Sequence, residues 1–73
     1  MFDENIIRDQ WQQFRGKAIE KWNQLTEDDL NYVNGSGDRL VATLQERYSY
    51  TYNQAVEQIE QVIAMLPQAT PSH

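Results

Sequence analysis

The 73-residue chain has no cysteine, so neither disulfide bonds nor thiolate metal sites can stabilise its fold. Its only histidine, His73, follows Pro71 in a segment with little to bury, and a zinc site or a catalytic triad therefore lacks its usual parts. No apolar run approaches the roughly 20 residues that span a bilayer. We therefore expect no catalytic residues, no metal, no cofactor and no membrane segment.

Basic residues are also few, with six against eleven acidic ones, which gives a net charge of −5. An acidic surface repels phosphate backbones, so nucleic acid is not an expected partner. The N-terminus Met1-Phe2-Asp3-Glu4 has neither the basic nor the apolar region of a signal peptide, which favours the cytoplasm. We expect a cytoplasmic monomer, and any partner is expected to be an unidentified protein.

Apolar residues at helical spacing are what the sequence does contain. In the first third, large apolar side chains recur every three or four residues and fall within an arc of about 80° on a helical wheel. This pattern predicts one helix from about Asp3 to Gln24, with Gly16 opposite the apolar stripe. The stripe consists of Ile7, Trp11, Phe14, Ala18, Trp22 and Leu25.

Capping residues mark a second, short helix near residues 27–33. Thr26 can accept from the amide of Asp29 while the carboxylate of Asp29 reaches back, which is a capping box. Asn34-Gly35 predicts the end of this helix, because both residues tolerate left-handed geometry.

Two more helices are predicted in the second half. The third begins after Ser36-Gly37 and runs to about Tyr48. Thr51 with Gln54 forms another capping box, which opens a fourth helix that Pro67 ends.

These segments predict an all-α fold with four helices in one domain, residues 1–66, followed by a disordered tail, residues 67–73. Short connections between the helices indicate antiparallel or crossed neighbours. Tyr48, Tyr50 and Tyr52 alternate with polar residues as in a strand, but the run is short and has no evident partner strand.

Several motifs occur together in one order. The first half has Trp11, Phe14, Gly16, Lys17, Glu20, Trp22 and then Leu25-Thr26 with Asp28-Asp29-Leu30. The second half has Gly35, Asp38, Leu40-Val41, Gln45-Glu46-Arg47-Tyr48, Tyr50 and Ala55. Together, over about residues 9–63, they resemble the CsbD-like family of small bacterial stress-response proteins.

The resemblance implies four helices arranged as two hairpins packed crosswise, similar to the sterile-alpha-motif-like bundles, and a place in the general stress response. It implies no reaction, because the family has no catalytic residues to carry over. The sequence departs from the family at Ser49, where a glycine is usual, and at Ser36-Gly37, where a basic pair is usual. A left-handed Ser49 would cost about 1 kcal/mol.

Two polar motifs could bind ions, and each also has a purely structural interpretation. Glu27-Asp28-Asp29 could attract a cation, but consecutive acids at a helix start point in different directions and suit the helix dipole better. Gly35-Ser36-Gly37 could cradle a phosphate, although a flexible turn between helices is the more ordinary use of such residues.

Three further groups invite a functional interpretation. The aromatic residues Trp11, Phe14 and Trp22 could line a pocket, but a single stripe of rings is typical of a core. In Gln45–Tyr48, we expect Glu46 and Arg47 to fix the corner between the third and fourth helices, with Tyr48 buried and its hydroxyl hydrogen-bonded. Four basic residues of the first helix could bind nucleic acid or form a solvated face, namely Arg8, Arg15, Lys17 and Lys21.

The sequence therefore favours a non-catalytic stress-response protein that acts through a weak protein interaction. The alternative hypothesis is a nucleic-acid-binding helical module that uses the basic face of the first helix.

Overall fold

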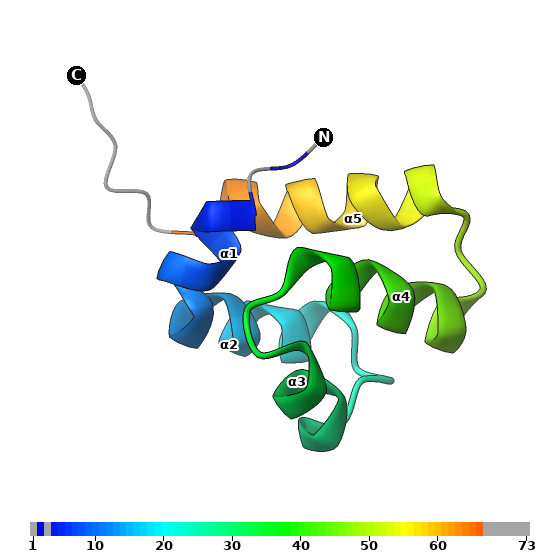
Figure 1. Cartoon of the computed structure of the whole chain (residues 1–73), viewed down its shortest axis with the longest axis horizontal. Helices are drawn as coiled ribbons and strands as arrows, with labels where there is room; N and C mark the ends of the chain where they lie inside the picture. The colour runs from blue at the N-terminus through cyan, green and yellow to red at the C-terminus, as the bar shows by residue number, and fades with distance from the viewer. Residues whose placement is uncertain (1, 3, 67–73) are drawn as a thin grey trace.

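The computed structural model describes residue 2 and residues 4–66, and this part of the chain is helical without any strand. The all-α prediction is confirmed, while the predicted count of four helices is wrong. The predicted tail, residues 67–73, lies outside the described residues. The five helices are α1 (Glu4–Asp9), α2 (Trp11–Lys21), α3 (Glu27–Val33), α4 (Gly37–Tyr48) and α5 (Tyr52–Met65) (Figure 1).

The predicted first helix is divided at Gln10, which has φ −113° and ψ 32°. The amide of Gln10 donates to the carbonyl of Ile6 at 2.9 Å and closes α1, and its own carbonyl accepts from Phe14 at 2.8 Å and opens α2. A single residue outside the helical region changes the direction of the chain but leaves the apolar spacing almost intact. The spacing therefore could not reveal the break.

The end of α2 also comes earlier than predicted. Trp22 has φ −116° and ψ 76°, outside the helical region, while its amide still donates to the carbonyl of Ala18 at 2.8 Å. The backbone turn buries the indole of Trp22. The helix thus ends at Lys21 instead of Gln24.

The predicted caps are confirmed. The hydroxyl of Thr26 accepts from the amide of Asp29 at 3.1 Å, and the carboxylate of Asp29 accepts from the amide of Thr26 at 3.1 Å. Thr51 and Gln54 exchange the equivalent bonds at 3.1 and 2.9 Å. Asn34 is left-handed with φ 43° and ends α3 as predicted.

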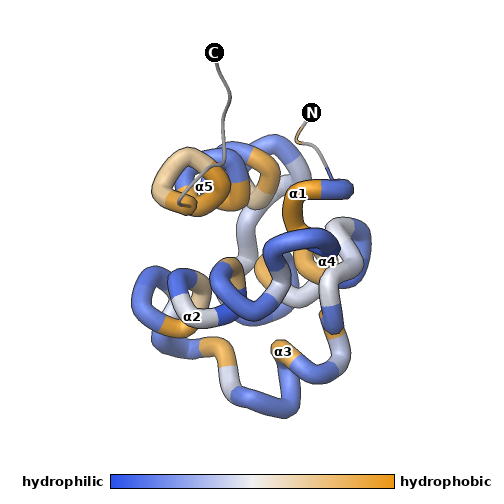
Figure 2. The backbone as a smooth tube through the Cα atoms, turned by 90° about the vertical axis from the view of Figure 1, so that its left-hand side faces the viewer, coloured by the Kyte–Doolittle hydropathy of each residue, from blue (hydrophilic) through white to orange (hydrophobic). Residues whose placement is uncertain are grey.

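The helices form a bundle in which α2 packs against α5, and α4 packs against both α3 and α5. Figure 2 looks along α2, α4 and α5, and both views place α3 on the side of the bundle away from α5. Of the two predicted hairpins, α4 and α5 form one, whereas α3 packs mainly on α4 instead of α2. The largest fully buried side chains are Trp22, Phe14, Ile7, Leu30, Leu40, Leu44, Ile59, Val33 and Val62.

Candidate functional site

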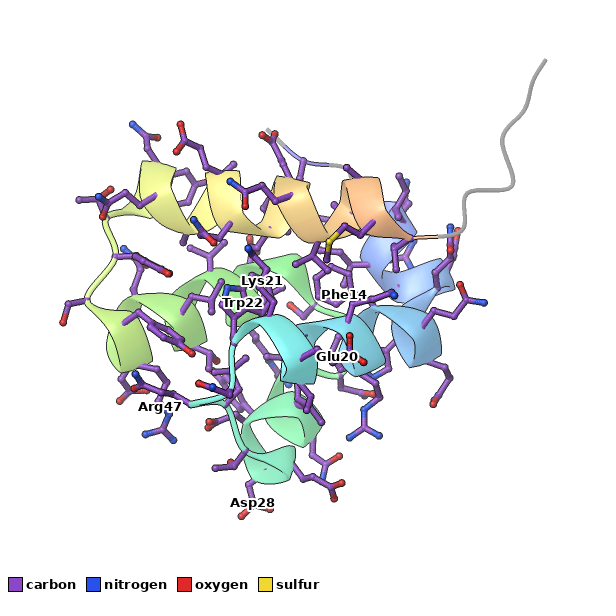
Figure 3. The ribbon with its side chains drawn as sticks, turned by 180° about the vertical axis from the view of Figure 1, so that it is seen from behind. Phe14, Glu20, Lys21, Trp22, Asp28 and Arg47 are labelled. Carbon is purple, nitrogen blue, oxygen red and sulfur yellow. The ribbon has the colours of Figure 1, made fainter. Side chains whose placement is uncertain are left out.

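The aromatic residues of α2 are mostly core. Phe14 is fully buried and Trp22 is 1% exposed, and their ring centroids lie 6.3 Å apart. Figure 3 shows both rings inside the bundle, so neither lines an open pocket. Trp11 differs from the prediction, because it is only half-buried while it stacks on Phe14 at 6.0 Å.

Arg47 contacts a different helix from the one predicted. Its guanidinium donates from Nε to Oδ2 of Asp29 at 3.0 Å and from a terminal nitrogen to Oδ1 at 2.8 Å. Arg47 therefore joins the end of α4 to the start of α3 and does not fix the corner before α5. A bidentate contact of this kind is geometrically specific, which makes it a structural element of the fold.

Tyr48 behaves almost as predicted. Its ring is half-buried and stacks on Tyr50 with centroids 5.3 Å apart, and its hydroxyl accepts from the amide of Gln24 at 3.1 Å. Ser49, which follows, is left-handed with φ 59°. Within the motif that ends α4, the side chains of Arg47 and Tyr48 therefore make contacts that hold the fold together, whereas Gln45 and Glu46 are exposed.

The acidic start of α3 is likewise part of the fold. The hydrogen bonds from Arg47 hold the pKa of Asp29 below 3.8, burial opposes this, and the Thr26 amide lowers the pKa further. Glu27 and Asp28 are exposed. Within residues 4–66, no three acidic or histidine side chains gather as metal ligands would. Nor does any helix of that part combine the length and the apolar character that crossing a bilayer requires.

The turn between α3 and α4 is closely packed, whereas the sequence suggested a flexible loop. A Cβ on Gly37 would lie 2.6 Å from the ring of Phe2 and 2.8 Å from Cγ of Glu4. Gly35 has φ +86°, and a Cβ there would lie 3.4 Å from Cα of Arg8. The two glycines therefore allow the N-terminal segment and α1 to approach this turn, which explains them without a phosphate.

The four basic residues of the predicted first helix do not form one face. Arg8 lies beside Gly35 of the α3–α4 turn and donates to Asn5 at 2.6 Å. Lys21 is on the side of α2 toward α5, where it donates to Gln61 at 3.1 Å. In α2, Arg15 and Lys17 are two residues apart and so about 160° apart around the helix. The four residues are thus divided between two helices and between two sides of α2, and nucleic-acid binding stays a hypothesis.

A groove of about 470 Å³ lies on the solvent side of α2, and its lining residues have no evident role in holding the helices together. Gly16 lines it, is exposed, and has no atom within 4 Å of the position a Cβ would occupy. Met65, at the end of α5, forms one edge and is 52% exposed. The remaining lining residues are Gln12, Gln13, Lys17 and Glu20.

Sequence reasoning detected only part of this groove. It placed Gly16 opposite the apolar stripe, which was the available signal. It could not bring Met65 to the same place, because the two residues are far apart in the chain and meet only through the packing of α2 on α5. The arrangement defines a small helical protein whose candidate functional site is a shallow mixed polar and apolar groove on α2. A second hollow, of about 390 Å³, is lined by Arg8, Asp9, Gln10, Trp11, Gln12 and Gln13.

Comparison with known proteins identifies the family. The chain is 44% identical over 50 residues to the UPF0337 protein YjbJ of Escherichia coli O6:H1, covering 68% of this chain and 72% of YjbJ. A UPF0337 protein of Pectobacterium atrosepticum is 46% identical over 50 residues, covering 68% and 72%. One from Pseudomonas aeruginosa is 38% identical over 55 residues, covering 75% and 85%. The chain belongs to the bacterial UPF0337 family, which is the CsbD-like family that its motifs resemble.

No protein-family model matches the sequence, and no solved structure matches the chain. The similarity to sterile-alpha-motif-like bundles therefore stays a prediction. The relatives belong to an uncharacterised family, so they bring neither a reaction nor a catalytic residue to this chain.

Proposed function

We propose that this protein is a non-catalytic, cytoplasmic member of the bacterial stress response that acts by weak protein binding through the groove on α2. The observation that supports binding is the pairing of Gly16 with the half-exposed Met65. Glycine inside a helix costs about 1 kcal/mol relative to alanine. Neither a special backbone angle nor a close neighbour requires glycine at this position, so access to the backbone is the remaining reason for it.

The contacts of the conspicuous polar residues support a role without catalysis. Arg47, Asp29 and Tyr48 are engaged in contacts that hold α2, α3 and α4 together. A general acid or base needs to face a cleft where a substrate can reach it. The residues that line the groove are two amides, one lysine, one glutamate, a glycine and a methionine, which suit contact better than proton transfer.

A deletion strain tests the proposal under osmotic, starvation and oxidative stress. We expect impaired survival that the wild-type gene restores and the Gly16→Leu gene does not, because the leucine side chain would occupy part of the groove. Ala42→Leu is the matched control, because it adds a leucine at an exposed position of α4 that does not line the groove. A deletion strain that survives every stress as well as its parent contradicts the stress role, and full rescue by Gly16→Leu contradicts the use of the groove.

A further inference from the structure

The groove carries one positive and one negative side chain that have no partner within the described part of the chain. Lys17 and Glu20 both line it, and neither forms a hydrogen bond or an ion pair with another described residue. Three residues along a helix correspond to about 60° of rotation and about 4.5 Å of rise, so the two charges share one face. They are therefore available to a molecule that covers this face.

A second copy of the chain satisfies both charges at once. When two α2 helices lie face to face and antiparallel, with a two-fold axis midway between Lys17 and Glu20, each lysine lies opposite the glutamate of the other copy. Such a contact is isologous and closes on itself as a dimer. A parallel arrangement would instead place lysine beside lysine, so the charges also specify the direction.

The other residues of the groove suit the same contact. Gly16 leaves the backbone of α2 bare on this face, which lets a second helix approach more closely than a side chain would permit. Met65 stands at the edge, and its flexible thioether can adapt to the surface that covers it. Figure 3 looks onto this side of the molecule, where Glu20 projects from α2 while Phe14 and Trp22 lie within the bundle.

We propose that two copies of this chain associate through antiparallel α2 helices, with Lys17 of each copy paired to Glu20 of the other. The inference rests on the proposed function only in that it uses the same groove, and it names a second copy as the occupant. It replaces the expectation of a monomer that the sequence suggested. Exposed ion pairs are individually weak, so the dimer is expected to be a low-affinity one that salt weakens further.

Sedimentation equilibrium of the full chain, from about 10 μM to about 1 mM at low salt, tests the proposal. Wild type is expected to show a concentration-dependent dimer. Lys17→Glu and Glu20→Lys each place like charges opposite one another, so each is expected to raise the dissociation constant about tenfold or more. An equimolar mixture of the two variants restores opposite charges across the interface and is expected to form a heterodimer, and the double variant K17E/E20K is expected to pair with itself.

Matched controls keep the test specific. Arg15→Glu makes the same change of charge on the other flank of α2, and Glu57→Lys makes it on the exposed side of α5; both are expected to dimerise like wild type. Circular dichroism of each variant confirms the fold. A wild type that stays monomeric at about 1 mM overturns the proposal. A dimer that forms as tightly in each of the two single variants as in wild type also overturns it, and so does an equimolar mixture of the single variants that does not associate.

The outcomes also separate this inference from the proposed function. If the chain is monomeric and Gly16→Leu still fails to rescue the deletion strain, the groove binds some other protein, and only the second copy is ruled out. If the dimer forms as expected and Gly16→Leu rescues fully, the dimer stands and the proposed role of the groove in stress survival does not.

Discussion

Arg47 donates two hydrogen bonds to the carboxylate of Asp29, at 3.0 and 2.8 Å. One of the same carboxylate oxygens also accepts from the amide of Thr26 at 3.1 Å and completes the cap of α3. A single side chain therefore both begins this seven-residue helix and ties it to the end of α4. Because so short a helix has little intrinsic stability, its position depends on this carboxylate.

Asp29→Ala is expected to lower the free energy of unfolding by about 2 kcal/mol, because it removes half of a capping box and a bidentate ion pair together. Urea denaturation followed by circular dichroism measures the loss. Asp28→Ala, in the same helical turn but without either contact, is the control and is expected to cost about 0.5 kcal/mol through the helix dipole alone. Equal losses from the two substitutions would contradict the assignment.

The same contacts predict how stability responds to acid. Arg47 and then the Thr26 amide hold the pKa of Asp29 below its ordinary 3.8. Because the folded pKa is lower than the unfolded one, the stability that Asp29 contributes is complete above the ordinary pKa and is lost as the pH falls through the lower value. The difference in unfolding free energy between wild type and Asp29→Asn should be constant from about pH 7 to about pH 5 and shrink below the ordinary pKa. A constant difference down to about pH 2 would refute this coupling.

Trp22 is expected to be the most costly residue to truncate. Trp22→Ala should lower the free energy of unfolding by about 3–5 kcal/mol and unfold much of the protein near 37 °C, because small domains have little stability to lose. Its Nε1 has no hydrogen-bond acceptor among the described residues, so Trp22→Phe removes an unsatisfied buried donor along with some volume. Trp22→Phe should therefore cost well under half as much. An unchanged melting temperature for Trp22→Ala would show that the indole does not stabilise the fold.

The features that the sequence predicted correctly are those whose signals are local. Thr26 and Asp29, and again Thr51 and Gln54, lie three residues apart, so each capping box can be recognised within a single helical turn. The buried position of Phe14 follows from a spacing that any amphipathic helix shows. Short-range geometry is nearly independent of the rest of the fold, which is why these predictions succeed.

The features that the sequence could not predict depend on contacts between distant segments. Arg47 and Asp29 are eighteen residues apart in the chain, and several acidic residues were equally plausible partners for that arginine. The break at Gln10 leaves the apolar spacing in place, so no pattern marks it. The groove exists only because the packing of α2 against α5 brings Met65 beside Gly16.

Ser49 offers a stabilising substitution. Its φ of 59° and ψ of 29° place a residue with a Cβ in the left-handed region, where glycine is relaxed. Ser49→Gly is expected to raise the free energy of unfolding by about 0.5–1 kcal/mol, after the greater freedom of glycine in the unfolded chain is subtracted. Ser49→Ala keeps the strain and is expected to bring no gain. Thermal melts of the two variants measure the change in stability. A gain in Ser49→Gly alone shows that relief of backbone strain is its cause, whereas an equal gain in Ser49→Ala would show that loss of the hydroxyl is.

Gly16 and Gly37 both lie in helices, yet their replacement by alanine should change stability in opposite directions. At Gly16 a Cβ meets nothing within 4 Å, so Gly16→Ala is expected to add about 1 kcal/mol through helix propensity. At Gly37 the Cβ would lie 2.6 Å from the ring of Phe2, so Gly37→Ala must displace that ring and is expected to cost about 1–3 kcal/mol. Denaturation at equal, low protein concentration compares them. If Gly16→Ala destabilised the isolated chain, the glycine would be needed for the fold. It would then no longer support the proposal that the groove binds a partner.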